Sequence, residues 1–135
     1  MVEITTNIFD MHDKVVLITG GSGYLGSAMC DILSELGATL IIASRSKSKN
    51  DLLAKKLGEK YDNKVISKHL DLSNSESVEI LVRDVINSHK RIDVLINNSY
   101  YGAGRELHSM DFNDWQKGID GSINSTYRVI REVIG

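Results

Sequence analysis

The sequence predicts an α/β fold with a doubly wound parallel sheet, because short apolar segments alternate with longer segments of helical spacing. Four apolar segments have the length of strands: Val15–Thr19, Thr39–Ala43, Val65–Leu70 and Asp93–Asn97. Three of them are apolar on both faces, which is typical of strands buried in a parallel sheet. The third, Val65–Leu70, is more mixed in polarity, so we expect it near an edge of the sheet.

Apolar residues recur at helical spacing after each strand. They predict helices that contain, in chain order, Leu25, Met29, Ile32, Leu33 and Leu36; Leu52, Leu53 and Leu57; Val78, Leu81, Val82, Val85 and Ile86; and Trp115, Ile119, Ile123, Tyr127, Ile130 and Ile134. Ser73 and Glu76 predict a capping box at the start of the third helix. Since parallel strands need right-handed crossovers, these four strand-helix units predict an open sheet with helices on both faces.

Composition and charge narrow the class of protein. The 135 residues, of which 41% are hydrophobic and 25% charged, suit one globular domain. A net charge of −2 gives no field for nucleic acid or an anionic membrane, so we expect neither as a partner. No apolar segment is long enough to span a bilayer, and the N-terminus lacks a secretory signal. The single cysteine, Cys30, cannot form an internal disulfide, so we expect a cytoplasmic protein with Cys30 in its core.

A glycine-rich turn, Thr19-Gly20-Gly21-Ser22-Gly23-Tyr24-Leu25-Gly26, follows the first strand and opens the first helix. Gly20 permits a tight turn, Gly23 lets a ligand approach the backbone, and Gly26 lets the helix pack close to the sheet. Free N–H groups and the positive end of the helix dipole would meet the pyrophosphate of a dinucleotide. The context predicts a Rossmann-type site, and the alternative is a glycine-rich connection without a ligand. The predicted binding residues are Gly20, Ser22, Gly23, Tyr24, Leu25 and Gly26.

The end of the second strand indicates which nicotinamide cofactor would fit. NAD-specific sites place an acidic residue there to bind the ribose 2′-hydroxyl, but this chain has Ser44 followed by Arg45. No carboxylate would repel a 2′-phosphate, and Arg45 could pair with it. We therefore expect Ser44 and Arg45 to favour NADP, with NAD as the alternative. The following residues, Ser46–Lys49, are expected to form a solvated loop, and Arg45 itself could belong to it.

Two further motifs bring a family into view. Asp71-Leu72 follows the third strand and Asn97-Asn98-Ser99-Tyr100 follows the fourth. Together with the glycine-rich turn they resemble the short-chain dehydrogenase/reductase family, from about Lys14 onward. The resemblance implies that Asp71, with Leu72 beside it, contacts the adenine. It also implies that Asn97, Asn98 and Ser99 line the cofactor, although Ser99 and Tyr100 depart from the family's Asn-Asn-Ala-Gly motif.

Other positions depart from the family pattern too. The Gly-x-x-Gly-x-x-Gly spacing, with Tyr24 between glycines, resembles the extended branch, which includes sugar-nucleotide epimerases and dehydratases. The segment Arg91–Asn98 instead resembles the single-domain branch. The family's catalytic-network Asn follows a tryptophan like Trp115, and Ser122 holds its place here, with Asn124 nearby.

The family's catalytic Tyr-x-x-x-Lys pair is missing from the sequence. None of the five tyrosines is followed by a lysine at that spacing. We therefore interpret residues 1–135 as an NAD(P)-binding domain, incomplete at its C-terminus, that has about four strand-helix units and no dehydrogenase activity of its own. Tyr100 and Tyr101 could line the nicotinamide side or pack in their loop. The four histidines share no metal-ligand spacing, so no metal site is expected.

The resemblance implies an oxidoreductase that transfers hydride between a nicotinamide and the carbonyl or hydroxyl carbon of a small molecule. The alternatives are an epimerase or dehydratase of the extended branch and a non-catalytic dinucleotide-binding module. Because family members commonly pair through the last helix, we also expect a homo-oligomer.

Overall fold

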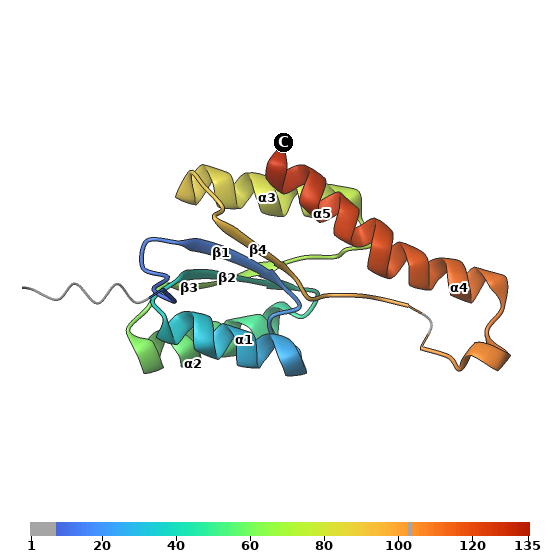
Figure 1. The fold of residues 1–135 in the computed structure, drawn as a ribbon, viewed down its shortest axis with the longest axis horizontal. Coiled ribbons are helices and arrows are strands. Elements are labelled where there is room, and N and C mark those ends of the chain that lie inside the picture. Colours follow the sequence, from blue (N-terminus) through green and yellow to red (C-terminus); the bar gives the residue numbers. More distant parts are fainter. Residues whose placement is uncertain (1–7, 103) are drawn as a thin grey trace, which may run out of the picture.

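One parallel sheet with the strand order β3-β2-β1-β4 organises the computed structural model, which describes residues 8–102 and 104–135. Two helices cover each face, α1 and α2 on one and α3 and α5 on the other (Figure 1). The elements are β1 (Val15–Thr19), α1 (Tyr24–Glu35), β2 (Thr39–Ser44), α2 (Lys47–Tyr61), β3 (Val65–His69), α3 (Ser75–His89), β4 (Val94–Asn97), α4 (Phe112–Ile119) and α5 (Ser125–Ile134). This arrangement confirms the predicted alternation and the edge position of the third strand.

The apolar residues of the inner strands feed two cores. On β1, Val15 and Leu17 face the α3 and α5 side, whereas Val16 and Ile18 face the α1 and α2 side. Successive side chains of a strand point to opposite faces, so a strand that is covered on both sides must be apolar throughout. The continuous apolar run of β1 is therefore a consequence of its central place in the sheet.

Helix α1 packs on the sheet through its small residues. Gly26, Cys30 and Ser34 are buried, while Leu25 and Ile32 of the predicted apolar stripe are 63% and 57% exposed. Small side chains let the helix axis lie close to the strands, which the larger ones would prevent. Cys30 is in the core as predicted, and burial raises the pKa of its thiol to about 12.

The start of α3 differs from the predicted capping box. Asn74 is the N-cap, and its side-chain Oδ1 accepts hydrogen bonds from the N–H groups of Glu76 at 2.9 Å and Ser77 at 3.4 Å. The Ser73 hydroxyl instead donates to Asp71 Oδ1 at 2.7 Å. The predicted capping box is therefore wrong, because the Ser73 hydroxyl group is bonded to the Asp71 carboxylate and Asn74 caps the helix.

The last helical segment is not one regular helix. A five-residue π-helix, Asp120–Asn124, separates α4 from α5. Gly121, Ser125 and Val129 form the buried side, so the predicted stripe lies largely outward, with Ile123 and Tyr127 both 62% exposed.

The predicted solvated loop at Ser46–Lys49 is also wrong, because α2 begins at Lys47. Within the residues that the structure describes, no helix is long and apolar enough to cross a membrane.

Candidate dinucleotide-binding site

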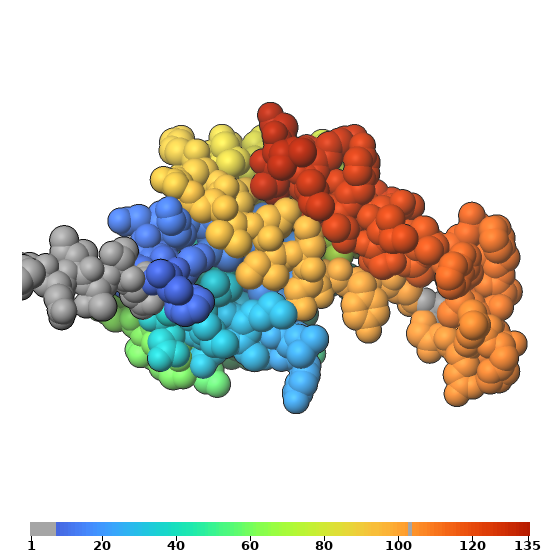
Figure 2. Space-filling model, viewed as in Figure 1, coloured from blue at the N-terminus to red at the C-terminus, as the bar shows by residue number. Residues whose placement is uncertain are grey.

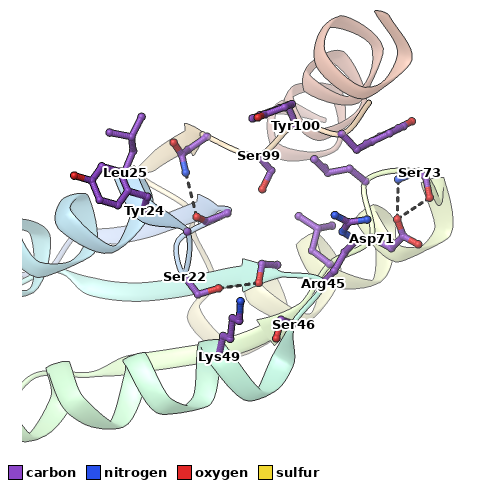
Figure 3. Close-up of a pocket in the computed structure, with 17 residues that line it drawn as sticks. Ser22, Tyr24, Leu25, Arg45, Ser46, Lys49, Asp71, Ser73, Ser99 and Tyr100 are labelled. Atoms are coloured by element: carbon purple, nitrogen blue, oxygen red, sulfur yellow. Dashed lines mark hydrogen bonds between the residues drawn. The ribbon is translucent and has the colours of Figure 1, made fainter. Parts of the chain in front are cut away.

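A cleft of about 670 Å³ lies at the carboxyl ends of the four strands (Figure 3). Its lining contains most of the predicted binding residues: Gly20, Ser22, Gly23, Tyr24, Leu25, Ser44, Arg45, Asp71, Leu72, Asn98 and Ser99. Gly26 and Asn97 do not line it. Gly26 is buried beneath the turn, and Asn97 is the last residue of β4, paired with Thr19 of β1. The topology thus brings four separate predicted segments to one place.

The glycine-rich turn shapes one wall of the cleft. Gly20 has φ +68°, a left-handed conformation that favours glycine. A Cβ atom on Gly26 would lie 2.2 Å from the Gly20 carbonyl oxygen, so only glycine lets α1 start this close to β1. The N-cap Gly23 offers no side chain to cap α1, and the first turn has no acidic residue. The N–H groups of that turn are therefore available to an anionic group such as a pyrophosphate.

Two hydroxyl groups meet where the turn faces the end of β2. Ser22 Oγ and Ser44 Oγ are 3.1 Å apart, and the Ser44 hydroxyl donates to Asn50 Oδ1 at 2.7 Å. Asn50 lies in the first turns of α2 and is fully buried. The position at which NAD-specific sites carry a carboxylate is thus occupied here by an uncharged hydroxyl group.

Two cations flank these hydroxyl groups. Arg45 extends across the cleft toward Asp71, and Lys49 points from α2 toward Ser22 (Figure 3). Hydrogen bonds from Ser73 hold the pKa of Asp71 below its ordinary value, and the Arg45 charge acts in the same direction. Asp71 is therefore an ionised hydrogen-bond acceptor at neutral pH, next to a site of positive charge.

The loop after β4 is fastened to the end of β1. Thr19 Oγ1 accepts hydrogen bonds from the N–H groups of Asn98 and Ser99, both at 3.1 Å. The Asn98 side chain donates to the Gly20 carbonyl at 3.1 Å. Tyr100 continues the lining and is 79% exposed. The β4 loop is therefore hydrogen-bonded to Thr19 and Gly20, the residues at which the glycine-rich turn begins.

Tyr101 also lines the cleft, and a hydrogen bond to a residue outside the lining holds its side chain. Its hydroxyl donates to Asp120, which also accepts from the Arg128 guanidinium, and Arg128 donates to the Leu72 carbonyl at 3.2 Å. Desolvation and, to a smaller extent, the hydrogen bond to Asp120 raise the pKa of Tyr101. Ser122, at the place of the family Asn, donates to the Gly118 carbonyl at 2.6 Å and does not line the cleft.

Four lining residues were absent from the predicted set, Ser46, Lys49, Leu70 and Ser73, and Tyr100 and Tyr101, for which a place in the lining was one of two interpretations, also line the cleft. Ser73 follows Asp71 at the spacing of a local side-chain turn, a signal that could have identified it. Lys49 gave no signal because its segment was expected to be a loop. Metal-binding groups of His, Cys, Asp or Glu are absent from the described part of the chain.

Comparisons with known proteins agree with this geometry. The family model for short chain dehydrogenase matches residues 14–135. An uncharacterized oxidoreductase of Staphylococcus saprophyticus is 31% identical over 125 residues, covering 93% of this chain and 50% of that protein. The 3-oxoacyl-[acyl-carrier-protein] reductase of Thermotoga maritima is 30% identical, covering 92% and 50%. The chain therefore spans about half the length of these curated relatives.

Solved structures give the same picture. A metagenomic short-chain oxidoreductase in complex with NADP has a TM-score of 0.83 and 27% identity, covering 93% of this chain and 57% of that one. L-Sorbose reductase from Gluconobacter frateurii, complexed with NADPH and L-sorbose, has a TM-score of 0.85 and 25% identity, covering 93% and 48%.

Proposed function

Because this chain belongs to the short-chain dehydrogenase family, we propose that its cleft binds NADP(H), with NAD(H) as the alternative cofactor. The observation that carries this proposal is the end of β2, where Ser44 replaces a carboxylate and Arg45 and Lys49 supply positive charge. An uncharged hydroxyl does not repel a 2′-phosphate, and a guanidinium pairs with it. The structural neighbours that hold NADP or NADPH support the same choice.

In this proposal, each of the remaining groups of lining residues binds a different part of the cofactor. The N–H groups at the start of α1 bind the pyrophosphate, and Asp71 accepts a hydrogen bond from the adenine amino group. Asn98 and Ser99 lie toward the nicotinamide ribose. The nicotinamide supplies the hydride, which we propose is exchanged with the carbonyl or hydroxyl carbon of a small molecule by the whole protein.

We further propose that the protein is a homo-oligomer whose copies meet at the outward side of α4 and α5. Figure 2 shows α4 and the segment before it projecting from the body of the domain. Phe112, Trp115 and Tyr127 on this side are 71%, 50% and 62% exposed. Such a row of large apolar side chains is typical of an interaction surface. Light scattering on the whole protein tests this proposal, and a clean monomer would refute it.

Calorimetric titration with NADPH and NADH tests the cofactor proposal directly. Arg45→Ala removes a charge-assisted contact, so we expect NADPH affinity to fall about 10-fold or more, and NADH affinity to change about twofold at most. Arg83→Ala, on α3 and outside the cleft, is the matched control and should change neither. Equal effects of Arg45→Ala on both cofactors, or no binding by the wild type, would contradict the proposal.

A further inference from the structure

Asn50 occupies a position that the pattern of α2 reserves for an apolar side chain. It shares the buried side of the helix with Ala54 and Leu57, and it is 0% exposed. It does not line the cleft. A buried amide must have hydrogen-bond partners to be tolerated, so its partners indicate what it does.

Among the described residues, the side-chain hydrogen bonds of Asn50 go to the ends of two strands. Its Nδ2 donates to the Lys68 carbonyl of β3 at 2.8 Å and to the Ser44 carbonyl of β2 at 3.5 Å. Its Oδ1 accepts the Ser44 hydroxyl at 2.7 Å. The reverse amide orientation would place two carbonyl oxygens against each other, so these contacts fix which end faces Ser44.

This orientation determines where the hydroxyl protons lie. Ser44 has one proton and gives it to Asn50, so Ser44 Oγ offers only lone pairs to its other neighbours. The Ser22 hydroxyl, 3.1 Å away, must then be the donor in the pair. The end of β2 therefore presents an acceptor without a negative charge.

We propose that Asn50 is a positioning residue that makes Ser44 an acceptor for the 2′-hydroxyl of an unphosphorylated adenosine ribose. The inference rests on the proposed function and extends it. Arg45 and Lys49 serve a 2′-phosphate, while the Ser44–Asn50 pair serves the hydroxyl of NAD(H) without placing a negative charge beside that phosphate. The same site thereby takes both cofactors, and Asn50 sets the ratio between them.

The test measures dissociation constants of NADH and NADPH for the whole protein and its Asn50→Leu variant. Leu keeps the branched shape and the number of heavy atoms of the side chain but frees the Ser44 proton, which can then be donated to a phosphate. We expect the ratio of the NADH constant to the NADPH constant to rise about three- to tenfold, as for the loss of one hydrogen bond. Asn63→Leu is the matched control. Asn63 also binds backbone carbonyls, those of Ser34 and Ala38, but beyond the opposite end of β2, so the ratio should not change.

A second comparison separates positioning from a general structural role. Ser44→Ala should raise the ratio by itself, and adding Asn50→Leu should then produce no further rise, because Asn50 acts through Ser44. An unchanged ratio in Asn50→Leu, or full additivity in the double variant, would overturn the inference. Failure of the wild type to bind either cofactor would instead overturn the proposed function.

Discussion

Replacement of Gly26 by alanine is the sharpest test of how the cleft is built. The new Cβ atom would lie 2.2 Å from the Gly20 carbonyl oxygen, 2.8 Å from Gly21 Cα and 2.9 Å from Asn98 Nδ2. Two of these neighbours are backbone atoms, which cannot rotate away. Relief of the shortest contact to about 3.4 Å requires α1 to move by about 1.2 Å relative to the turn.

The expected cost follows from that displacement. Overpacking a close contact costs about 1–3 kcal/mol, and loss of the Asn98 bond to the Gly20 carbonyl adds about 1 kcal/mol. Alanine recovers up to about 1 kcal/mol of helix propensity. We therefore expect the free energy of unfolding to fall by about 1–4 kcal/mol. NADPH affinity should fall about 10-fold or more, because the N–H groups of α1 move with the helix.

Urea denaturation followed by circular dichroism measures the first quantity, and calorimetric titration measures the second. Gly118→Ala is the control, because a Cβ there meets no described atom within 4 Å, and helix propensity alone predicts a gain of about 0.5–1 kcal/mol. If Gly26→Ala were as stable as Gly118→Ala and bound NADPH as the wild type does, the close approach of α1 to β1 would not be a requirement of the site.

Three other predictions follow from the described contacts. Iodoacetamide should label Cys30 at pH 8 only in unfolded protein, because its thiol is buried and its pKa is raised to about 12; mass spectrometry measures the labelling. Tyr101 and Arg128 hold the pKa of Asp120 below its ordinary value, so this stabilisation is present at neutral pH and is lost as pH falls below about 4. Asp120→Asn should therefore lower stability by about 1 kcal/mol at pH 7, and less in acid. Residues 1–135 alone should bind NADPH without oxidising it, as absorbance at the nicotinamide band would record.

Each of these has a clear contrary result. Labelling of folded protein at the rate of a free thiol would show that α1 opens readily. An unfolding free energy of Asp120→Asn that keeps the wild-type dependence on acid would show that this carboxylate is not linked to folding. Turnover of NADPH by the 135 residues would show that the chain contains an acid/base pair of another kind.

The inner strands were predictable because their side chains point alternately to two faces of the sheet, both of which are covered. A segment such as Val15–Ile18 is apolar throughout only if both sides of the strand are covered, so its sequence indicates a central place in the sheet. The glycine-rich turn was predictable for a similar reason, since Gly20 and Gly26 meet backbone constraints that few other residues satisfy. The Asp71 and Asn98 motifs were placed by the strands that precede them.

The stripe predicted for α3, Val78, Leu81, Val82 and Val85, is buried, but the orientation of α1 and α5 was not predictable, because spacing alone does not say which stripe faces inward. On α1 the large stripe of Leu25 and Ile32 competed with a small stripe that contains Cys30, and close packing favoured the small one. In the π-helix at Asp120–Asn124, Gly121 lies against Tyr101, where a Cβ would be 1.7 Å from the Tyr101 carbonyl oxygen. Contacts of this kind join distant segments and leave no local pattern.

Thr19 gives the cleft a property that reaches beyond ligand recognition. Its buried hydroxyl group accepts the hydrogen bonds that hold the β4 loop, and the glycine-rich turn follows its strand directly. A ligand bound to these two loops is therefore attached to the centre of the sheet. Occupancy of the cleft is then thermodynamically linked to unfolding of the whole domain, and a bound cofactor should raise the melting temperature further as the ratio of its free concentration to its dissociation constant increases. Thermal melting can thus rank ligands for this protein without an assay of its activity.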